Sequence, residues 1–301
     1  MAAPKLDRAL NLITPLEPGA PRRPRDAAPA AALARQSVHR TALRRIEAAV
    51  ASSCGSQHQR NEDAHSALDC AGSLFVVADG VGGGAMAQMA SRLLVEQLHA
   101  ALAAEPIDAE RARRAMLDAD RTIAQRIAEV TDAPGAATVV LCAPVNRWAS
   151  TWLLAWVGDC RIYRLALAGG REIELLTRDD TFRHLGELPA AGGSLDDPAR
   201  MVGNGATTGA NVALHDLACG DLLALCSDGV HKHVDSADWR RVLTQPDSLL
   251  QRCESLIALA RANGSTDDAT LLLVQRVGLG LPRPRWLSGW GAAAVPSRRA
   301  P

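Results

Sequence analysis

The stretch LFVVADGVGG, residues 74–83, places a run of large apolar side chains directly before an aspartate and a glycine. A continuous apolar run of this length, followed by glycine, is typical of a buried strand. The apolar run Leu222–Cys226 stops just before Asp228, and the run Trp152–Val157 stops just before Asp159. The chain therefore repeats one unit, a buried strand with a carboxylate at its end.

Segments with helical spacing lie between these strands. Residues 85–104 place methionine and leucine side chains three and four positions apart, and Asp108 can cap a second helix. A late helix is expected to stop at Asn263, which a glycine follows in a favourable left-handed cap. Further strands are expected at Val139–Leu141 and Thr270–Gln275. This order predicts an α+β fold with a sheet core flanked by helices.

The sequence indicates one domain between two tails. At 301 residues the chain is long enough to bury one sizeable core. Residues 15–34 are mostly proline, alanine and arginine, and such a segment cannot bury enough apolar surface to offset the entropy cost of ordering. We expect residues 1–45 to be a tail or linker, residues 46–278 to form the folded domain, and residues 279–301 to be a second tail.

Composition disfavours several classes of function. Lysine plus arginine total 33, as do aspartate plus glutamate, so the chain lacks the basic field that concentrates a protein on nucleic acid. The seven cysteines are scattered and without a Cys-x-x-Cys pair, which favours reduced thiols over a disulfide framework. No apolar run approaches the roughly 20 residues that cross a bilayer, and the N-terminus lacks the apolar stretch of a signal peptide. We expect a soluble, cytoplasmic, monomeric protein.

Four aspartates carry the expected chemistry: Asp79, Asp159, Asp228 and Asp267, each at a predicted junction of strand and loop. A single Asp-Gly pair is most often only a turn. Several carboxylates that converge repel one another, however, and are costly to bury unless cations bind among them. Oxygen ligands without an ordered set of histidines or cysteines favour Mg²⁺ or Mn²⁺, and two such ions can activate a water for attack on a phosphate ester.

Five motifs, in this order and at this separation, resemble the metal-dependent serine/threonine phosphatases of the type 2C or PPM family, bacterial type. The motifs are RNEDA at 60–64, VADGVGG at 77–83, VGDCR at 157–161, CSDG at 226–229 and DDAT at 267–270. The resemblance covers residues 50–276 and implies two packed antiparallel sheets with helices outside and a metal cluster at one end. Residues 178–210 are similar to the family's variable flap beside the active site.

The resemblance also implies the ligands of two Mn²⁺ or Mg²⁺ ions. Asp79 matches the carboxylate that bridges both ions, and Gly80 matches the residue whose backbone carbonyl binds one of them. Asp228 and Asp267 match residues that complete the coordination of the other ion. Asp268 stands where the family often has asparagine, so the direct ligand is assigned to Asp267 and its neighbour is placed behind it.

Other charged positions have subsidiary roles in the family. Glu62 and Asp63 match an acidic pair that acts near the metals largely through bound water, and Asp159 matches a ligand of a weaker third ion. His58 stands where the family usually has an arginine that binds phosphate, so charge at this position becomes dependent on pH. Arg60 is expected to compensate.

The segment His231-Lys232-His233 follows the Asp228-Gly229 turn. Alternate residues of a strand share a face, so the two histidines could form part of a zinc site. No other set of histidines or cysteines supports that hypothesis, and an exposed polar turn is the preferred interpretation. No clear general acid is evident in the sequence.

The leading hypothesis is a phosphatase that acts on phosphoserine and phosphothreonine in proteins and opposes a bacterial serine/threonine kinase. The alternative is a pseudophosphatase that binds a phosphoprotein without turnover, supported by substitutions at His58, Gly84 and Gln88 relative to the family pattern. A third hypothesis is a phosphatase of small phosphoesters, because no motif separates protein from small-molecule substrates.

Overall fold

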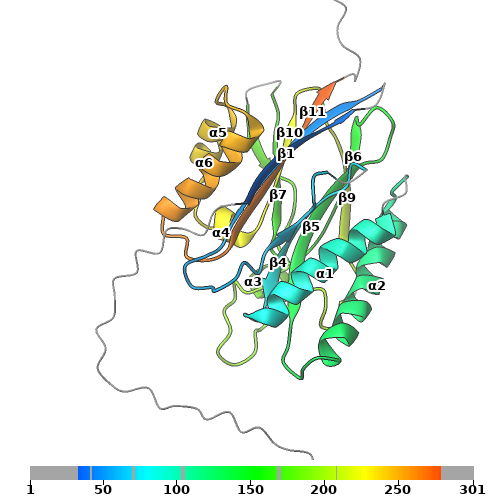
Figure 1. Ribbon diagram of the computed structural model, residues 1–301, viewed down its shortest axis with the longest axis vertical. Helices are drawn as coiled ribbons and strands as arrows, with labels where there is room; N and C mark the ends of the chain where they lie inside the picture. The colour runs from blue at the N-terminus through cyan, green and yellow to red at the C-terminus, as the bar shows by residue number, and fades with distance from the viewer. Residues whose placement is uncertain are drawn as a thin grey trace, which may run out of the picture. The chain divides into compact units, whose positions relative to one another are not determined.

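The structure is a computed structural model that describes residues 33–40, 43–69, 72–102, 106–167, 171–207 and 209–278. Within this part of the chain, two antiparallel sheets pack against each other between two layers of helices (Figure 1). The predicted α+β sandwich is confirmed.

The first sheet has six strands in the spatial order β1-β2-β11-β10-β7-β8. Its members are β1 (Leu33–Arg40), β2 (Arg45–Ser53), β11 (Ala269–Gly278), β10 (Leu222–Cys226), β7 (Arg161–Leu165) and β8 (Ile173–Leu175). Strand β10 pairs with β7 and β11, so that Cys226 lies opposite Arg161 on one side and Leu271 on the other. Because Asp228 follows β10 so closely, this register fixes where its carboxylate leaves the sheet.

The second sheet has five strands in the spatial order β3-β4-β5-β6-β9. Its members are β3 (Ala64–His65), β4 (Phe75–Val81), β5 (Ala136–Pro144), β6 (Thr151–Val157) and β9 (Asn211–Asp216). Asp79 lies opposite Thr138 in the pairing of β4 with β5. The sequence placed Asp79 at the strand's end, but β4 continues to Val81 because Gly80 and Val81 still pair with β5.

Helices cover the outer face of each sheet. The covering helices are α1 (Ala85–Leu102), α2 (Ala109–Ala128), α5 (Ser236–Leu243) and α6 (Leu249–Ala262). Two short helices, α3 (Phe182–Leu185) and α4 (Asp228–His231), lie in connecting segments. Asp108 caps α2 as predicted, since its side chain accepts the backbone N–H of Arg111 at 2.8 Å. Gly264, after the end of α6, has the expected left-handed backbone with φ +95°. Within the described residues, no helix is both long and apolar enough to span a membrane.

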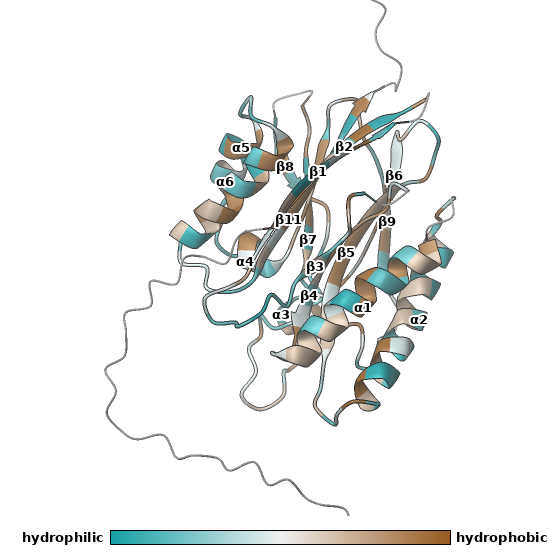
Figure 2. Ribbon diagram, viewed as in Figure 1, coloured by the Kyte–Doolittle hydropathy of each residue, from teal (hydrophilic) through white to brown (hydrophobic). Residues whose placement is uncertain are grey.

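The core has three parts. Apolar side chains of α1 and α2 pack on the five-stranded sheet, those of α5 and α6 pack on the six-stranded sheet, and a third cluster fills the space between the sheets. Figure 2 shows the resulting brown strands between helices that are hydrophobic on one side. Every residue of β5 is buried because this strand is covered on both faces. Double coverage explains why the deciding strands are continuous apolar runs rather than alternating ones.

Strand β1 differs from the expectation for the N-terminal segment. Leu33–Arg40 lies within residues 1–45, which we expected to be tail or linker. The strand pairs along its length with β2, from Leu33 opposite Ser52 to Arg40 opposite Arg45. Its side chains remain mostly exposed or half-buried. Backbone hydrogen bonding to β2 therefore orders this segment, although its apolar content alone predicts no ordered structure.

Candidate metal centre

Five aspartates from both sheets converge. Asp79 is on β4, Asp228 begins α4 after β10, Asp159 is in the turn between β6 and β7, Asp63 directly precedes β3, and Asp267 precedes β11. The negative charges of the other four all act on the carboxyl group of Asp79, which shares a side-chain hydrogen bond with Asp228. The four aspartates singled out in the sequence are therefore neighbours in space, together with Asp63.

The cluster perturbs the protonation of its members. Burial and the charge of Asp228 raise the pKa of Asp79 well above its usual value. The same two causes raise the pKa of Asp159 to about 7, and burial raises the pKa of Asp63 to about 8. At Asp228 burial is outweighed by the ammonium of Lys232, so its pKa is lowered. Without further positive charge the cluster retains protons that carboxylates normally release, as expected of a site built for cations.

Asp63 and Glu62 line this cluster from the segment before β3. Both residues are buried. Asp63 Oδ2 accepts a hydrogen bond from Ser227 Oγ at 2.7 Å, while its buried Oδ1 has no hydrogen-bond partner in the described part of the chain. Glu62 Oε1 accepts the backbone N–H of Gly84 at 2.5 Å. A buried carboxylate oxygen without a partner is costly, so Asp63 Oδ1 marks a place for a cation or a water molecule.

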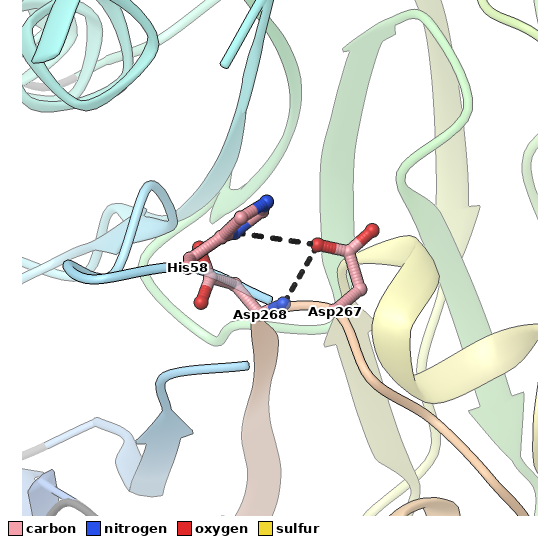
Figure 3. A group of neighbouring side chains, drawn as sticks. All are labelled: His58, Asp267 and Asp268. Carbon is pink, nitrogen blue, oxygen red and sulfur yellow. Dashed lines mark hydrogen bonds and ion pairs between the residues drawn. The ribbon is translucent and has the colours of Figure 1, made fainter. Parts of the chain in front are cut away.

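Asp267 and Asp268 have different environments (Figure 3). The side chain of Asp268 is 3% exposed and accepts the backbone N–H groups of Gly55 at 2.7 Å and Glu62 at 2.6 Å, and His58 Nδ1 lies 2.9 Å away. The side chain of Asp267 is 50% exposed, and its Oδ1 accepts the backbone N–H of Asp268. Burial and a neighbouring aspartate raise the pKa of Asp267. Asp268 is thus engaged by N–H donors, whereas Asp267 faces the acidic cluster.

His58, Asp267 and Asp268 also offer ligand atoms within 4.8 Å of one another. Their geometry alone would suit a metal ion. Both oxygens of Asp268 already accept N–H groups, however, and His58 directs Nδ1 at the same carboxylate. His58 and Asp268 therefore form a hydrogen-bonded support for the neighbouring Asp267.

A pocket of about 410 Å³ opens beside this support. It is lined by Gln57, His58, Gln59, Arg60, Glu62, Gly84 and Ala85. Both residues predicted to bind phosphate, His58 and Arg60, contribute to its wall, and Arg60 is exposed. A cationic side chain, a histidine and two amides in one recess can bind an oxyanion or a polar peptide group.

Two glycines permit the backbone to close around the carboxylates. A Cβ atom at Gly80 would lie 2.5 Å from the carbonyl oxygen of Ala87 on α1. A Cβ atom at Gly229 would lie 1.9 Å from the carbonyl oxygen of Asp268. Glycine is therefore required after Asp79 and after Asp228 for steric reasons.

Helix α4 places one side chain, that of His231, differently from the prediction of an exposed polar turn. His231 is buried, and its Nε2 lies 3.0 Å from the carbonyl oxygen of Asp159, so the prediction is wrong for this residue. The reason is that Asp228–His231 forms a helical turn, which directs His231 inward. Lys232 Nζ lies 2.6 Å from Asp228 Oδ2. The spacing of four residues between Asp228 and Lys232 was the available signal for that ion pair.

The segment that we expect to form a flap, residues 178–210, is attached to α2. Asp120, buried on α2, accepts backbone N–H groups of Gly203 at 2.6 Å, Gly205 at 3.1 Å and Thr207 at 3.3 Å. Its outer part contains the short helix α3 and the exposed Leu188. The flap is therefore firmly held at one end while its tip is open to solvent.

The donors in the cluster fit hard divalent ions. Asp79, Asp228 and Asp267 supply carboxylate oxygens from three different segments, and Gly80 directly follows Asp79 on β4. Oxygen-only donor sets with several negative charges suit Mg²⁺ and Mn²⁺. The raised pKa of Asp79 and the buried Asp63 Oδ1, which has no hydrogen-bond partner among the described residues, are two signs that positive charge belongs here.

Comparison with known proteins points to one family. A family model described as protein phosphatase 2C matches residues 50–262. The serine/threonine phosphatase stp of Listeria welshimeri is 27% identical over 220 residues, which cover 67% of this chain and 84% of that protein. PppA, described as a key regulatory component of T6SS in Pseudomonas aeruginosa, has a similar structure, with a TM-score of 0.65 and 27% identity over 80% of this chain and 100% of that one. The catalytic domain of the serine/threonine protein phosphatase PstP, solved with two manganese ions, gives a TM-score of 0.65 at 23% identity over 77% and 98%.

Proposed function

The chain belongs to the protein phosphatase 2C family, whose members are metal-dependent serine/threonine phosphatases, and we propose how its own residues carry out that reaction. The observation that carries the proposal is the convergence of Asp79, Asp228 and Asp267, in which burial and the charge of Asp228 raise the pKa values of Asp79 and Asp267. Asp79 would bridge two Mn²⁺ or Mg²⁺ ions, the backbone carbonyl of Gly80 would bind one, and Asp228 with Asp267 would complete the other.

Bound divalent ions acidify water and offset the charge that develops on a phosphate during its hydrolysis. The chain's contribution is to orient the participants. Asp63 Oδ1, which is buried without a partner, would accept a hydrogen bond from water in the centre, and Glu62 would act beside it. Ser227 fixes the Asp63 carboxylate from the opposite side at 2.7 Å. Both acids would thereby position water rather than bind a metal directly.

Arg60 and His58 would bind the phosphate at the wall of the adjacent pocket. The Nδ1 of His58 is engaged with Asp268, so Nε2 donates to a phosphate oxygen when the ring is protonated. Arg60 supplies the permanent charge that histidine lacks near neutral pH. Arg60 and His58 would together bind the phosphate in place of the single arginine that the family pattern has at position 58.

The proposed substrates are phosphoserine and phosphothreonine in proteins, modified by a bacterial serine/threonine kinase that this enzyme opposes. Similarity to the Listeria serine/threonine phosphatase and to PppA supports this role in signalling. The proposed location is the cytoplasm and the proposed state is a monomer. The six cysteines in the described residues are unpaired, which suits a reducing compartment.

The test is manganese-dependent release of phosphate from a phosphothreonine peptide. Native protein should be active, whereas Asp79→Asn and Asp228→Asn should lose turnover with native circular dichroism retained. Asp118→Asn on the exposed face of α2 is the matched control and should keep full activity. Parallel assays with free phosphoserine distinguish a protein phosphatase from a small-ester phosphatase. A native chain that binds manganese but releases no phosphate between about pH 6 and pH 9 would instead support the pseudophosphatase.

A further inference from the structure

Lysine is rare in this chain. All but two of the 33 basic residues are arginine, and the two lysines are Lys5 and Lys232. Arginine carries a delocalised charge on a broad planar fork, whereas the lysine ammonium is a compact point charge with three donors. Lys232 is the one lysine in the described residues, and it lies at the acidic cluster.

The ammonium of Lys232 lies between two aspartates. Nζ is 2.6 Å from Asp228 Oδ2 and 3.8 Å from Asp159 Oδ2. The side chain of Asp159 is only 5% exposed, whereas that of Lys232 is 46% exposed. Lys232 therefore borders solvent along part of its side chain, while its ammonium group reaches the buried Asp159. The backbone N–H of Lys232 donates to the carbonyl oxygen of Asp228 at 3.1 Å, which fixes the root of the side chain at the end of α4.

A third divalent ion beside the two-metal centre would lie at Asp159, the residue that matches a ligand of such an ion, and the carboxylate of Asp228 is close enough for its charge to act on Asp159. Lys232 already supplies both carboxylates with a cation. A divalent ion in that place would have to displace the ammonium or lie within a few ångströms of it, at a large electrostatic cost. The residues present therefore do not fit a third ion.

We infer that Lys232 is a built-in cation that takes the place of a third metal ion, so that the chain binds two divalent ions and no more. This inference rests on the proposed two-metal centre and specifies its stoichiometry. An ammonium group offsets negative charge but does not acidify water as a divalent ion does. Lys232 is therefore a positioning residue that holds Asp228 and Asp159 in place.

The first experiment counts manganese ions bound per full-length chain by equilibrium dialysis. The native chain should saturate at two ions. Lys232→Gln should bind one additional, weaker ion, and adding Asp159→Asn to that variant should remove it again. Arg240→Gln on the neighbouring α5 is the matched control for loss of one positive charge and should leave two ions bound. Three ions on the native chain, or two on a folded Lys232→Gln chain, would overturn the inference.

A second experiment needs no variant. Lys232 and Lys5 are the only side-chain amines, so acetylation followed by mass spectrometry reports on each separately. With Lys5 as the internal reference, Lys232 should be protected at least tenfold and remain so at saturating manganese. A rise in its labelling to the level of Lys5 when manganese is added would show that an ion displaces the ammonium.

The two proposals fail in different ways. A native chain that binds no manganese contradicts the metal centre itself. A native chain that binds three ions contradicts only the assignment of Lys232. Neither readout depends on turnover.

Discussion

Replacement of Asp268 by asparagine tests the division of labour between the paired aspartates. In the structure Oδ1 of Asp268 accepts the N–H of Gly55, while Oδ2 accepts the N–H of Glu62 and faces Nδ1 of His58. An asparagine has one oxygen and one amino group, so the amino group would face at least one backbone N–H. An unsatisfied buried donor costs about 1–3 kcal/mol, and a hydrogen bond to a charged group contributes about 1.5–3 kcal/mol. We expect Asp268→Asn to lower the free energy of unfolding by about 2–4 kcal/mol.

The assay is urea unfolding in EDTA, because removing metals separates the support of the fold from binding of the ions. Asp267→Asn is the matched control, since its side chain is half exposed and it neighbours the same loop. It should change stability by less than about 0.5 kcal/mol while weakening manganese binding. An Asp268→Asn protein as stable as the native chain in EDTA, with unchanged dependence on urea, would refute the assignment of Asp268 as a support.

Three further predictions follow from single contacts and charges. Gly229→Ala should reduce soluble yield and lower the unfolding free energy by more than about 3 kcal/mol, because its Cβ would lie 1.9 Å from a backbone oxygen; thermal melts check this. The pKa values of Asp63 and Asp159 are raised by burial to about 8 and about 7, from a usual value of 3.8. The folded, metal-free chain therefore binds more protons than the unfolded chain, and its stability should fall as pH rises from about 4 to about 8. Urea titrations in EDTA should show that fall, and saturating manganese should abolish it. Asp120→Ala should release the flap, because three backbone N–H groups lose their acceptor; limited proteolysis within residues 178–210 should become faster, and KM for a phosphopeptide should rise more than KM for a small ester.

The parts of the fold that the sequence predicts are those encoded locally. Leu222–Cys226 is a strand with the expected bounds, because a short apolar run between polar residues has few other uses. Asp108 begins α2 for an equally local reason, since its side chain satisfies an N–H of the first turn. The sequence also indicated the acidic cluster, because each of the four aspartates lies close to the start or the end of a buried strand.

Other features depend on partners distant in the sequence. Strand β1 is ordered by β2, and no apolar pattern in Leu33–Arg40 signals that pairing. His231 is buried because the turn containing Asp159 lies against α4, which a polar triplet cannot reveal. The ion pair of Lys232 with Asp159 has the same origin. Sequence patterns predict individual helices and strands better than they predict which loops and turns come into contact.

The substitution at His58 is coupled to a second one. By the family resemblance, His58 stands where an arginine is usual and Asp268 where an asparagine is frequent, and His58 Nδ1 lies 2.9 Å from Asp268 Oδ2. Each exchange alone would leave an unusual group beside the metal ligands. As a pair they form a hydrogen bond with each other, and the Asp268 carboxylate also accepts two backbone N–H groups. We therefore interpret His58 and Asp268 as one coupled change in the residues that support the site.

The remaining substitutions behind the pseudophosphatase hypothesis have local partners too. The N–H of Gly84 binds Glu62 at 2.5 Å, and the amide of Gln88 donates to the carbonyl oxygen of Asn61 at 2.8 Å. Both contacts tie the start of α1 to the segment that carries the acidic pair. A binding module under no demand for turnover would have no need to maintain these ties or a costly cluster of buried carboxylates. The substitutions are therefore expected to alter affinity for phosphate while leaving the metal-dependent reaction in place.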